Sequence, residues 1–315
     1  HTMSELLRSS LTMIAQGWGD QGDAARLQDD PLLAIAGSDG RGAGAADKAL
    51  ASQASFSRLL DRLANHGNGA ILDAAPMALA GRRIRATNRD RRLAQATIDV
   101  DGLPLPAYGE QPGSAYNGHV LERIHYPLIA SCAETGDMLA GLLRPGNAGP
   151  AWNAADWIPV LVEQARCHFA RTVRVRLDAG FTDGKTLAAL DGHDIGYVGR
   201  LRGSPAMTRL FEPHRTRGPG RPAQSPREWV VEETYQADSW DRSRRLVIVV
   251  QEHPAELFRQ CFFLVTNLPA DRFSGEQVLA LYRRRGKAEG HMGELKDVIG
   301  ESLPCTSRGV ASDET

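Results

Sequence analysis

The sequence predicts an α/β protein with a mixed β-sheet flanked by helices, a helical region before it and a β-rich insertion within it. Three observations lead to this class. Residues 1–90 show helical spacing of apolar residues, residues 95–201 alternate between strand-like and helix-like stretches, and residues 228–252 contain two runs with period-2 alternation. With 42% hydrophobic and 24% charged residues over 315 positions, the composition is that of a globular protein with one or two domains.

The N-terminal part contains two stretches with helical periodicity, MSELLRSSLTMIAQGW (3–18) and ASFSRLLDRLANHG (54–67). The segment LASQASFSRLLDRL (50–63) has the pattern of a short helix, a turn and a second helix, which fits a DNA-reading element or a plain corner of a helical bundle. Residues 81–92 hold six Arg and one Asp, typical of phosphate contact or of a solvated face. We assign residues 1–92 to a helical region and predict that it binds DNA.

Three strands are expected next, followed by a helix, a strand, a short helix and a strand. The corresponding segments are QATIDVDGL (95–103), RIHYPLIASCA (123–133), DMLAGLLRPG (137–146), the amphipathic helix 154–170, TVRVRLDAGF (172–181), DGKTLAALDGH (183–193) and IGYVGRL (195–201). This β-β-β-α-β-α-β order describes the ribonuclease H-like fold, in which the first and fourth strands are neighbours. The predicted core therefore comprises residues 93–202 and 261–300, interrupted by the β-rich insertion 203–260 and followed by a tail, 301–315.

The last predicted helix spans 273–299 and begins with a capping box formed by Ser274 and Gln277. At about 100° per residue, four side chains of this helix fall on one narrow stripe: Tyr282, Arg285, Glu289 and Lys296. Charged residues at this spacing also occur on ordinary solvated helices, so the stripe needs support from other parts of the chain.

Acidic residues stand at three positions that this fold brings together. Asp99 and Asp101 lie in the first strand, Asp178 ends the fourth strand and Glu289 lies on the last helix. An Asp within an apolar strand is costly to bury unless it is paired or binds a metal ion. Three converging carboxylates suit two Mg²⁺ ions and the in-line displacement at a phosphodiester that such ions support. Alternation cannot choose between Asp99 and Asp101, because both project from the same face.

The spacing of Tyr282, Arg285, Glu289 and Lys296 matches the Y-(2)-R-(3)-E-(6)-K signature of bacterial insertion-sequence transposases in the IS4-like DDE superfamily. Other stretches resemble the DDE group 1 transposases, the insertion-sequence 1380 family: GWGDQGDAARLQDDPLLA, LASQASFSRL, TIDVDGLPLPAYGEQPGSAYNGH, RLDAGF and YRRRGKAEGHMGELK. The similarity runs over nearly the whole chain. It implies a DNA transposase that cleaves transposon ends and transfers the strand to target DNA.

The resemblance also assigns roles to individual residues. Asp101, with Asp99 as the alternative, Asp178 and Glu289 would be catalytic and would bind a two-ion Mg²⁺ site in which Mn²⁺ can substitute. Asp101 is favoured because VDG resembles the family's aspartate–glycine start to the following loop. Tyr282, Arg285 and Lys296 would bind DNA phosphates. The insertion would hold DNA and offer an aromatic side chain, Trp229 or Trp240, to a flipped base.

The resemblance implies that the partners are terminal inverted repeats and target DNA, bound by a homodimer on paired ends in the bacterial cytoplasm. No apolar run approaches the length of a membrane span, and no CxxC pair suggests a zinc site. Members of this group usually extend further at both ends, so the chain is expected to be a fragment or a shortened copy. Two alternatives follow: a truncated transposase that only binds DNA, and a ribonuclease H-like metal-dependent nuclease without strand transfer.

Overall fold

The computed structural model describes residues 1–20, 22–40, 43–65, 67–107, 111–217, 220 and 224–286. Its centre is a mixed sheet of eight strands in the order β6-β5-β1-β7-β8-β11-β10-β9. These strands are β1 (Leu93–Gly102), β5 (Leu128–Cys132), β6 (Met138–Leu142), β7 (Ala170–Leu177), β8 (Gly196–Leu201), β9 (Arg227–Tyr235), β10 (Arg244–Glu252) and β11 (Gln260–Thr266). The α/β class with a large mixed sheet flanked by helices is confirmed, and the topology is consistent with the ribonuclease H-like fold.

The order of the first five strands of this sheet follows the predicted pattern. β1 pairs antiparallel with β5 and parallel with β7, and β7 pairs parallel with β8. The helices between them are α6 (Ala154–His168) and α7 (Gly184–Gly192). The first strand and the strand that carries Asp178 are therefore neighbours, so their carboxyl ends meet at one edge of the sheet.

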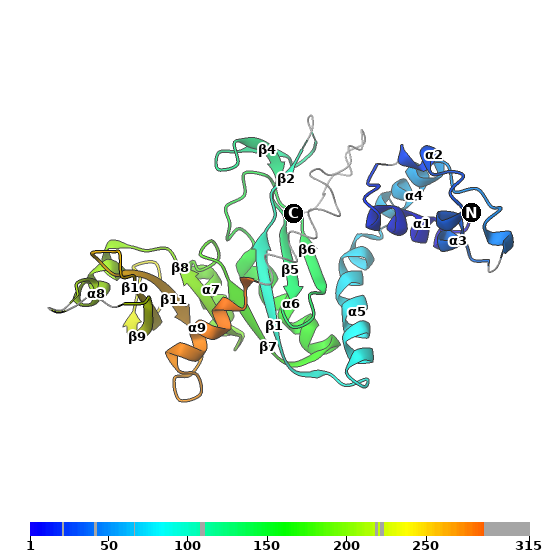
Figure 1. Cartoon of the computed structure of the whole chain (residues 1–315). Helices are drawn as coiled ribbons and strands as arrows, with labels where there is room; N and C mark the ends of the chain where they lie inside the picture. Colours follow the sequence, from blue (N-terminus) through cyan, green and yellow to red (C-terminus); the bar gives the residue numbers. More distant parts are fainter. Residues whose placement is uncertain are drawn as a thin grey trace.

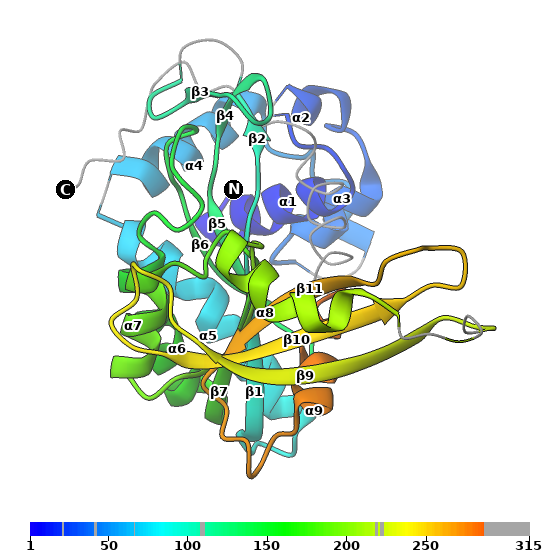
Figure 2. The ribbon, with the colours of Figure 1, turned by 90° about the vertical axis from the view of Figure 1, so that its left-hand side faces the viewer.

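The two faces of the sheet carry different side chains. Alternate residues of β1 and β7, among them Ile98, Val100 and Val175, join the main hydrophobic core with side chains of α5 (Gly69–Thr87), α6, α7 and α8 (Pro205–Arg215). On the opposite face, α9 (Gly275–Arg283) covers β8, β10 and β11 through a smaller apolar cluster. Figure 2 shows α9 on the side of the sheet away from α6 and α7. The period-2 alternation therefore directs Asp99 and Asp101 away from the main core.

The predicted insertion contains the hairpin of β9 and β10, and these strands join the main sheet. β10 pairs with β11, and β11 pairs antiparallel with β8, so the sheet continues without a break from the predicted core into the hairpin. β9 is the outer strand of this extension (Figure 2). A second sheet of three short strands, β2 (Leu105–Pro106), β4 (Glu122–His125) and β3 (Ala115–Asn117), lies between β1 and β5 in the sequence.

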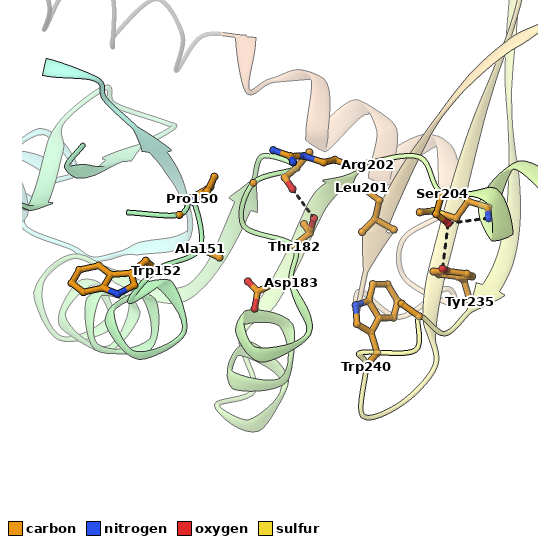
Figure 3. Close-up of a pocket in the computed structure, with 15 residues that line it drawn as sticks. Pro150, Ala151, Trp152, Thr182, Asp183, Leu201, Arg202, Ser204, Tyr235 and Trp240 are labelled. Atoms are coloured by element: carbon orange, nitrogen blue, oxygen red, sulfur yellow. Dashed lines mark hydrogen bonds between the residues drawn. The ribbon is translucent and has the colours of Figure 1, made fainter. Parts of the chain in front are cut away.

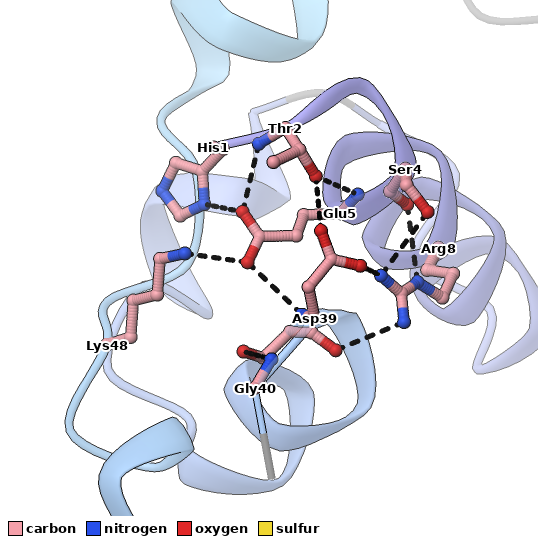
Figure 4. A network of polar contacts seen from close by, with 9 residues as sticks. His1, Thr2, Ser4, Glu5, Arg8, Asp39, Gly40 and Lys48 are labelled. Atoms are coloured by element: carbon pink, nitrogen blue, oxygen red, sulfur yellow. Dashed lines mark hydrogen bonds and ion pairs between the residues drawn. The ribbon is translucent and has the colours of Figure 1, made fainter.

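The N-terminal helices form a cluster of their own. They are α1 (Met3–Ala15), α2 (Asp23–Arg26), α3 (Pro31–Gly37), the short 3-10 helix η1 (Ala43–Ala45) and α4 (Gln53–Asn65). Their apolar core, which includes Met13, Leu33 and Phe56, is separate from the main core. Figure 1 shows this cluster beside the rest of the molecule, joined to it through α5. A polar network around Glu5 ties the start of α1 to Lys48 and Asp39 (Figure 4).

One expectation about local structure is corrected. Residues 50–63 contain the single helix α4 instead of a helix, a turn and a second helix, because Ser52 accepts the first helical backbone hydrogen bonds from Ser55 and Phe56. Among the cysteines, Cys132 is buried, whereas Cys167 on α6 is exposed. Within the described residues, no helix is long and apolar enough to cross a membrane.

Candidate active site

Asp99 is bound by a neighbouring arginine. In the register of β1 and β7, Asp99 lies opposite Arg176, whose Nε and Nη2 donate to the two carboxylate oxygens at 2.6 and 2.5 Å. Asp99 is 1% exposed and Arg176 2%. Burial raises the pKa of the Asp99 carboxyl, and the Arg176 guanidinium opposes that rise. Both carboxylate oxygens of Asp99 are therefore engaged by a protein cation.

Asp101 stands two residues further along β1, at the carboxyl edge of the sheet. The last registered pair of β1 and β7 is Val100 with Leu177, so Asp101 and Asp178 follow side by side on strands that are about 4.8 Å apart. Burial raises the pKa of Asp101, the charge of Arg285 lowers it and the charge of Asp178 raises it. The electrostatic influence of Asp178 on Asp101 agrees with this register.

Arg285 brings the chain segment after α9 to this edge. Its Nη2 donates to Asp101 Oδ2 at 2.8 Å, and the residue is 8% exposed. Burial acts to lower the pKa of Arg285, but the charges of Asp101 and Asp178 raise it. Two side chains that the sequence analysis singled out independently, Asp101 and Arg285, are thus joined across 184 positions of the chain.

The predicted helix 273–299 is only partly described. The capping box of Ser274 and Gln277 is confirmed, and α9 follows it from Gly275 to Arg283. Arg284 and Arg285 then form a turn in which the Arg285 N–H donates to the Tyr282 carbonyl, so the helical register ends before Arg285 and the expectation of one unbroken helix is corrected there. Glu289 and Lys296 lie outside the described residues.

Tyr126 is a neighbour of this edge that the sequence analysis missed. A Cβ on Gly102 would lie 2.7 Å from both Cζ and Oη of Tyr126, so the phenol packs directly on the residue after Asp101. Burial raises the pKa of Tyr126; the charge of Arg144 lowers it, and those of Asp101 and Asp178 raise it. Arg144 lies over the ring at 5.1 Å, and its Nε donates to the Tyr126 carbonyl at 2.8 Å. The glycine of the VDG motif was the sequence feature that could have indicated this contact, because only a residue without a side chain leaves room for the ring.

A pocket of about 610 Å³ opens at the carboxyl ends of β7 and β8, lined there by Ala179, Gly180 and Leu201. Trp152, Tyr235 and Trp240 contribute aromatic surface to its wall (Figure 3). Tyr235 and Trp240 meet edge to face with ring centroids 5.5 Å apart. Trp240 therefore lines a cavity, whereas the other predicted aromatic, Trp229, packs under Arg259 at 4.9 Å and is not among the residues that line this pocket.

The donor set at the sheet edge fits hard divalent cations. Carboxylate oxygens are the ligands that Mg²⁺ prefers, and Asp101 in β1 and Asp178 directly after β7 present them at the same edge of the sheet. Among the residues that the structure describes, no group of three His, Cys, Asp or Glu side chains is arranged to hold a metal ion. The third predicted carboxylate, Glu289, belongs to the part of the chain outside that description.

A comparison with known families matches a model described as transposase DDE domain group 1 to residues 1–309. The chain belongs to this family. The fold of this group 1 DDE transposase domain resembles a piggyBac transposase in a synaptic complex with hairpin DNA, solved by cryo-EM, with a TM-score of 0.53 and 12% sequence identity. The match covers 97% of this chain and 61% of the piggyBac chain, so this chain spans about three fifths of that protein. No curated protein matches the sequence.

The edge of the sheet at the carboxyl ends of β1 and β7 gathers several of the residues that the sequence analysis singled out. The structure brings Asp101, Asp178 and Arg285 together and turns Asp99 into a partner of Arg176. Arg176 escaped the sequence analysis because its partner depends on the register of two strands 77 residues apart. DDE transposase domains generally use divalent metal ions.

Proposed function

We propose that this chain is a DNA transposase that cleaves DNA at the ends of a mobile element and joins the freed 3′-hydroxyls to target DNA. The observation that carries the proposal is the placement of Asp101 and Asp178 at the carboxyl ends of two neighbouring parallel strands, with Arg285 donating to Asp101. Family membership supports the same assignment. We also propose that the chain belongs to the bacterial insertion-sequence 1380 family and acts in the cytoplasm.

The first catalytic carboxylate in this proposal is Asp101. Asp99 is the poorer ligand, because a metal ion there would have to displace the buried Arg176 guanidinium from both of its oxygens. Asp178 is the second carboxylate. Glu289 is assigned as the third on the Y-R-E-K spacing alone.

Mg²⁺, or Mn²⁺ in its place, would be held as two ions by Asp101, Asp178 and Glu289, and would activate the attacking oxygen and stabilise the leaving alkoxide. The chain's own contribution is to fix these oxygens on rigid strands. Arg285 neutralises Asp101 when no other cation does, and its charge favours a DNA phosphate close to the carboxylates. Tyr282 and Lys296 complete the proposed phosphate-binding set.

The DNA partner is proposed to be the terminal inverted repeats and the target, held by a homodimer on paired ends. The hairpin DNA in the similar piggyBac complex supports DNA as the partner. We further assign the pocket at the carboxyl ends of β7 and β8 to a base next to the scissile bond, with Trp240 as the predicted aromatic and Trp152 as a second wall.

The domain division is proposed as it was predicted, with residues 1–92 helical and DNA-binding, 93–202 and 261–300 catalytic, 203–260 an insertion and 301–315 a tail. The separate apolar core of α1–α4 supports an independent helical unit. The pairing of β11 with β8 makes the insertion part of the same sheet as the core.

The test uses a plasmid that contains the genomic DNA flanking this coding sequence, incubated with the purified protein, Mg²⁺ and a second target plasmid. Cleavage at the element ends with joined products supports the transposase. Cleavage without joining supports the nuclease alternative, and binding without cleavage supports the DNA-binding alternative. Asp178→Asn should abolish cleavage, whereas Asp156→Asn, an exposed carboxylate on α6, should leave it unchanged.

A further inference from the structure

α9 is attached to the outer strand β9 at two points. At its start, the Gly275 N–H donates to Glu232 Oε1 at 2.7 Å. At its end, Arg283 Nη2 donates to Glu228 Oε2 at 2.5 Å. We call these two contacts the α9 clamp.

The two points match in spacing. Gly275 and Arg283 are eight helical residues apart, which corresponds to about 12 Å along a helix axis. Glu228 and Glu232 are four strand residues apart, which corresponds to about 13 Å along an extended chain. Because 228, 230 and 232 project from one face of the strand, both carboxylates and Val230 face α9 together. The helix therefore runs antiparallel to β9 in one defined register.

The first contact tolerates little variation. A Cβ on Gly275 would lie 2.8 Å from Glu232 Oε1 and 2.9 Å from Val230 Cγ2, so the glycine permits the close approach of the strand. The carboxylate lies at the positive end of the helix dipole, where a negative charge is favourable. Arg245 holds the other oxygen, Glu232 Oε2, through its Nε at 2.8 Å.

Arg245 extends the contact to the loop before the helix. Its Nη1 donates to the Leu268 carbonyl at 2.9 Å and its Nη2 to the Phe273 carbonyl at 2.7 Å. The hairpin, the loop and the start of α9 are thus linked through charged groups. The end of the clamp at Arg283 lies two residues before Arg285, which reaches Asp101.

We propose that Glu228 and Glu232 are positioning residues of the reaction site, which fix the register of α9 on β9 and thereby place Arg285 against Asp101. This inference rests on the proposed function, because the site it serves is the one assigned there. In this proposal the β9–β10 hairpin positions α9 for the reaction, in addition to any contact that it makes with DNA. A shift of the helix by a fraction of a turn would move Arg285 away from Asp101.

The test is a charge exchange across the exposed end of the clamp. Glu228→Arg and Arg283→Glu each break the ion pair, and the double variant restores it with reversed polarity. Glu233→Arg is the matched control, since Glu233 is an exposed carboxylate of the same strand and lies on the face away from α9. The first readout is amide hydrogen exchange of residues 275–285, which does not depend on activity. The second is the single-turnover rate of cleavage of the plasmid used for the proposed function.

Each single variant should raise exchange in α9 about tenfold and lower the cleavage rate about tenfold, because a misplacement of about 1 Å at a reaction site has effects of this size or larger. The double variant should return both quantities to within about threefold of the wild type. The Glu233→Arg control should change neither. Recovery in the double variant separates positioning from direct DNA contact, because a glutamate at 283 cannot bind phosphate.

Three results would overturn the proposal. Unchanged exchange in the single variants would mean that the clamp does not fix α9. Recovery of exchange without recovery of cleavage would mean that Arg283 acts on DNA directly. Absence of cleavage by the wild type would contradict the proposed function and, with it, the role of the clamp in the reaction. The exchange data distinguish this result from the first two, because they report on α9 whether or not the protein cleaves DNA.

Discussion

Asp99 and Arg176 form a two-point ion pair at the centre of the sheet, with donor–acceptor distances of 2.6 and 2.5 Å. Arg176 uses its remaining terminal nitrogen, Nη1, to donate to the Leu281 carbonyl in α9 at 3.0 Å. One guanidinium therefore joins β1, β7 and the last described helix. Its partner is the aspartate that looked equivalent to Asp101 in the sequence.

Removal of one member of this pair should be strongly destabilising. Arg176→Met leaves the Asp99 carboxylate buried without a counter-charge, and we expect the free energy of unfolding to fall by about 3–5 kcal/mol. Urea denaturation followed by circular dichroism measures the change. Arg171→Met, at an exposed position of the same strand, is the control and should change stability by less than about 0.5 kcal/mol. A loss below about 1 kcal/mol for Arg176→Met would contradict a buried ion pair.

Substitution of Arg285 should affect metal and DNA binding in opposite directions. Arg285→Gln removes the positive charge that donates to Asp101, so Mn²⁺ should bind about three- to tenfold more tightly. The same change should weaken the binding of an element-end duplex, measured in Ca²⁺, about tenfold, because a charge-assisted phosphate contact is lost. Calorimetry and fluorescence anisotropy measure the two affinities. Arg284→Gln is the control for the Mn²⁺ affinity. Weaker Mn²⁺ binding in Arg285→Gln would show that Arg285 and the metal ion do not compete for Asp101.

Enlargement of Gly102 should disturb the packing beside Asp101. The added Cβ of Gly102→Ala would lie 2.7 Å from the ring and hydroxyl of Tyr126, which Arg144 holds in place. Overpacking of this kind costs about 1–3 kcal/mol, measured as a shift of the urea midpoint. Gly118→Ala serves for comparison, since its Cβ would meet no atom within 4 Å. Equal stability of the two variants would show that Tyr126 moves aside freely.

The N-terminal helices should lose stability in acid through Glu5. Hydrogen bonds from Lys48 and from the Thr2 and Asp39 amides lower the pKa of Glu5 from 4.5 to about 2. Because the folded state binds this proton less tightly than the unfolded state, the stabilisation is complete above pH 4.5 and is lost as the pH falls through about 2. The stability difference between the wild type and Glu5→Gln should shrink over this range. A difference that stays constant with pH would contradict the shift. Thermal melts of α1–α4 followed by NMR at several pH values measure the stability difference between the two proteins.

The sequence predicted the elements that local signals define. The capping box at Ser274 and Gln277 is a contact within four residues, and the alternation of β1 and β7 depends only on which side chains are apolar. The neighbouring positions of β1 and β7 followed from the order of elements, because the fold leaves few ways to arrange that order. Element order and alternation together therefore suffice to place Asp101 and Asp178 at the same edge of the sheet.

Long-range pairing was beyond the reach of the sequence analysis. Asp99 and Asp101 have the same alternation, and only the register that sets Arg176 opposite Asp99 distinguishes them. The hairpin β9–β10 was visible as two alternating runs, but its continuation through β11 to β8 depends on backbone hydrogen bonds between distant segments. Tyr126 was missed for the same reason, since it lies between β4 and β5 and its contact with Gly102 joins separate segments of the chain.

The outer position of β9 also bears on how these molecules behave in concentrated solution. The free side of a terminal strand offers unpaired backbone groups with which another chain's strand can pair. Three of the nine residues of β9 are glutamates, Glu228, Glu232 and Glu233. Charged side chains on an edge strand disfavour pairing with the strand of another chain, which opposes growth of the sheet from one molecule into the next. We therefore expect the strand that orients α9 also to oppose aggregation.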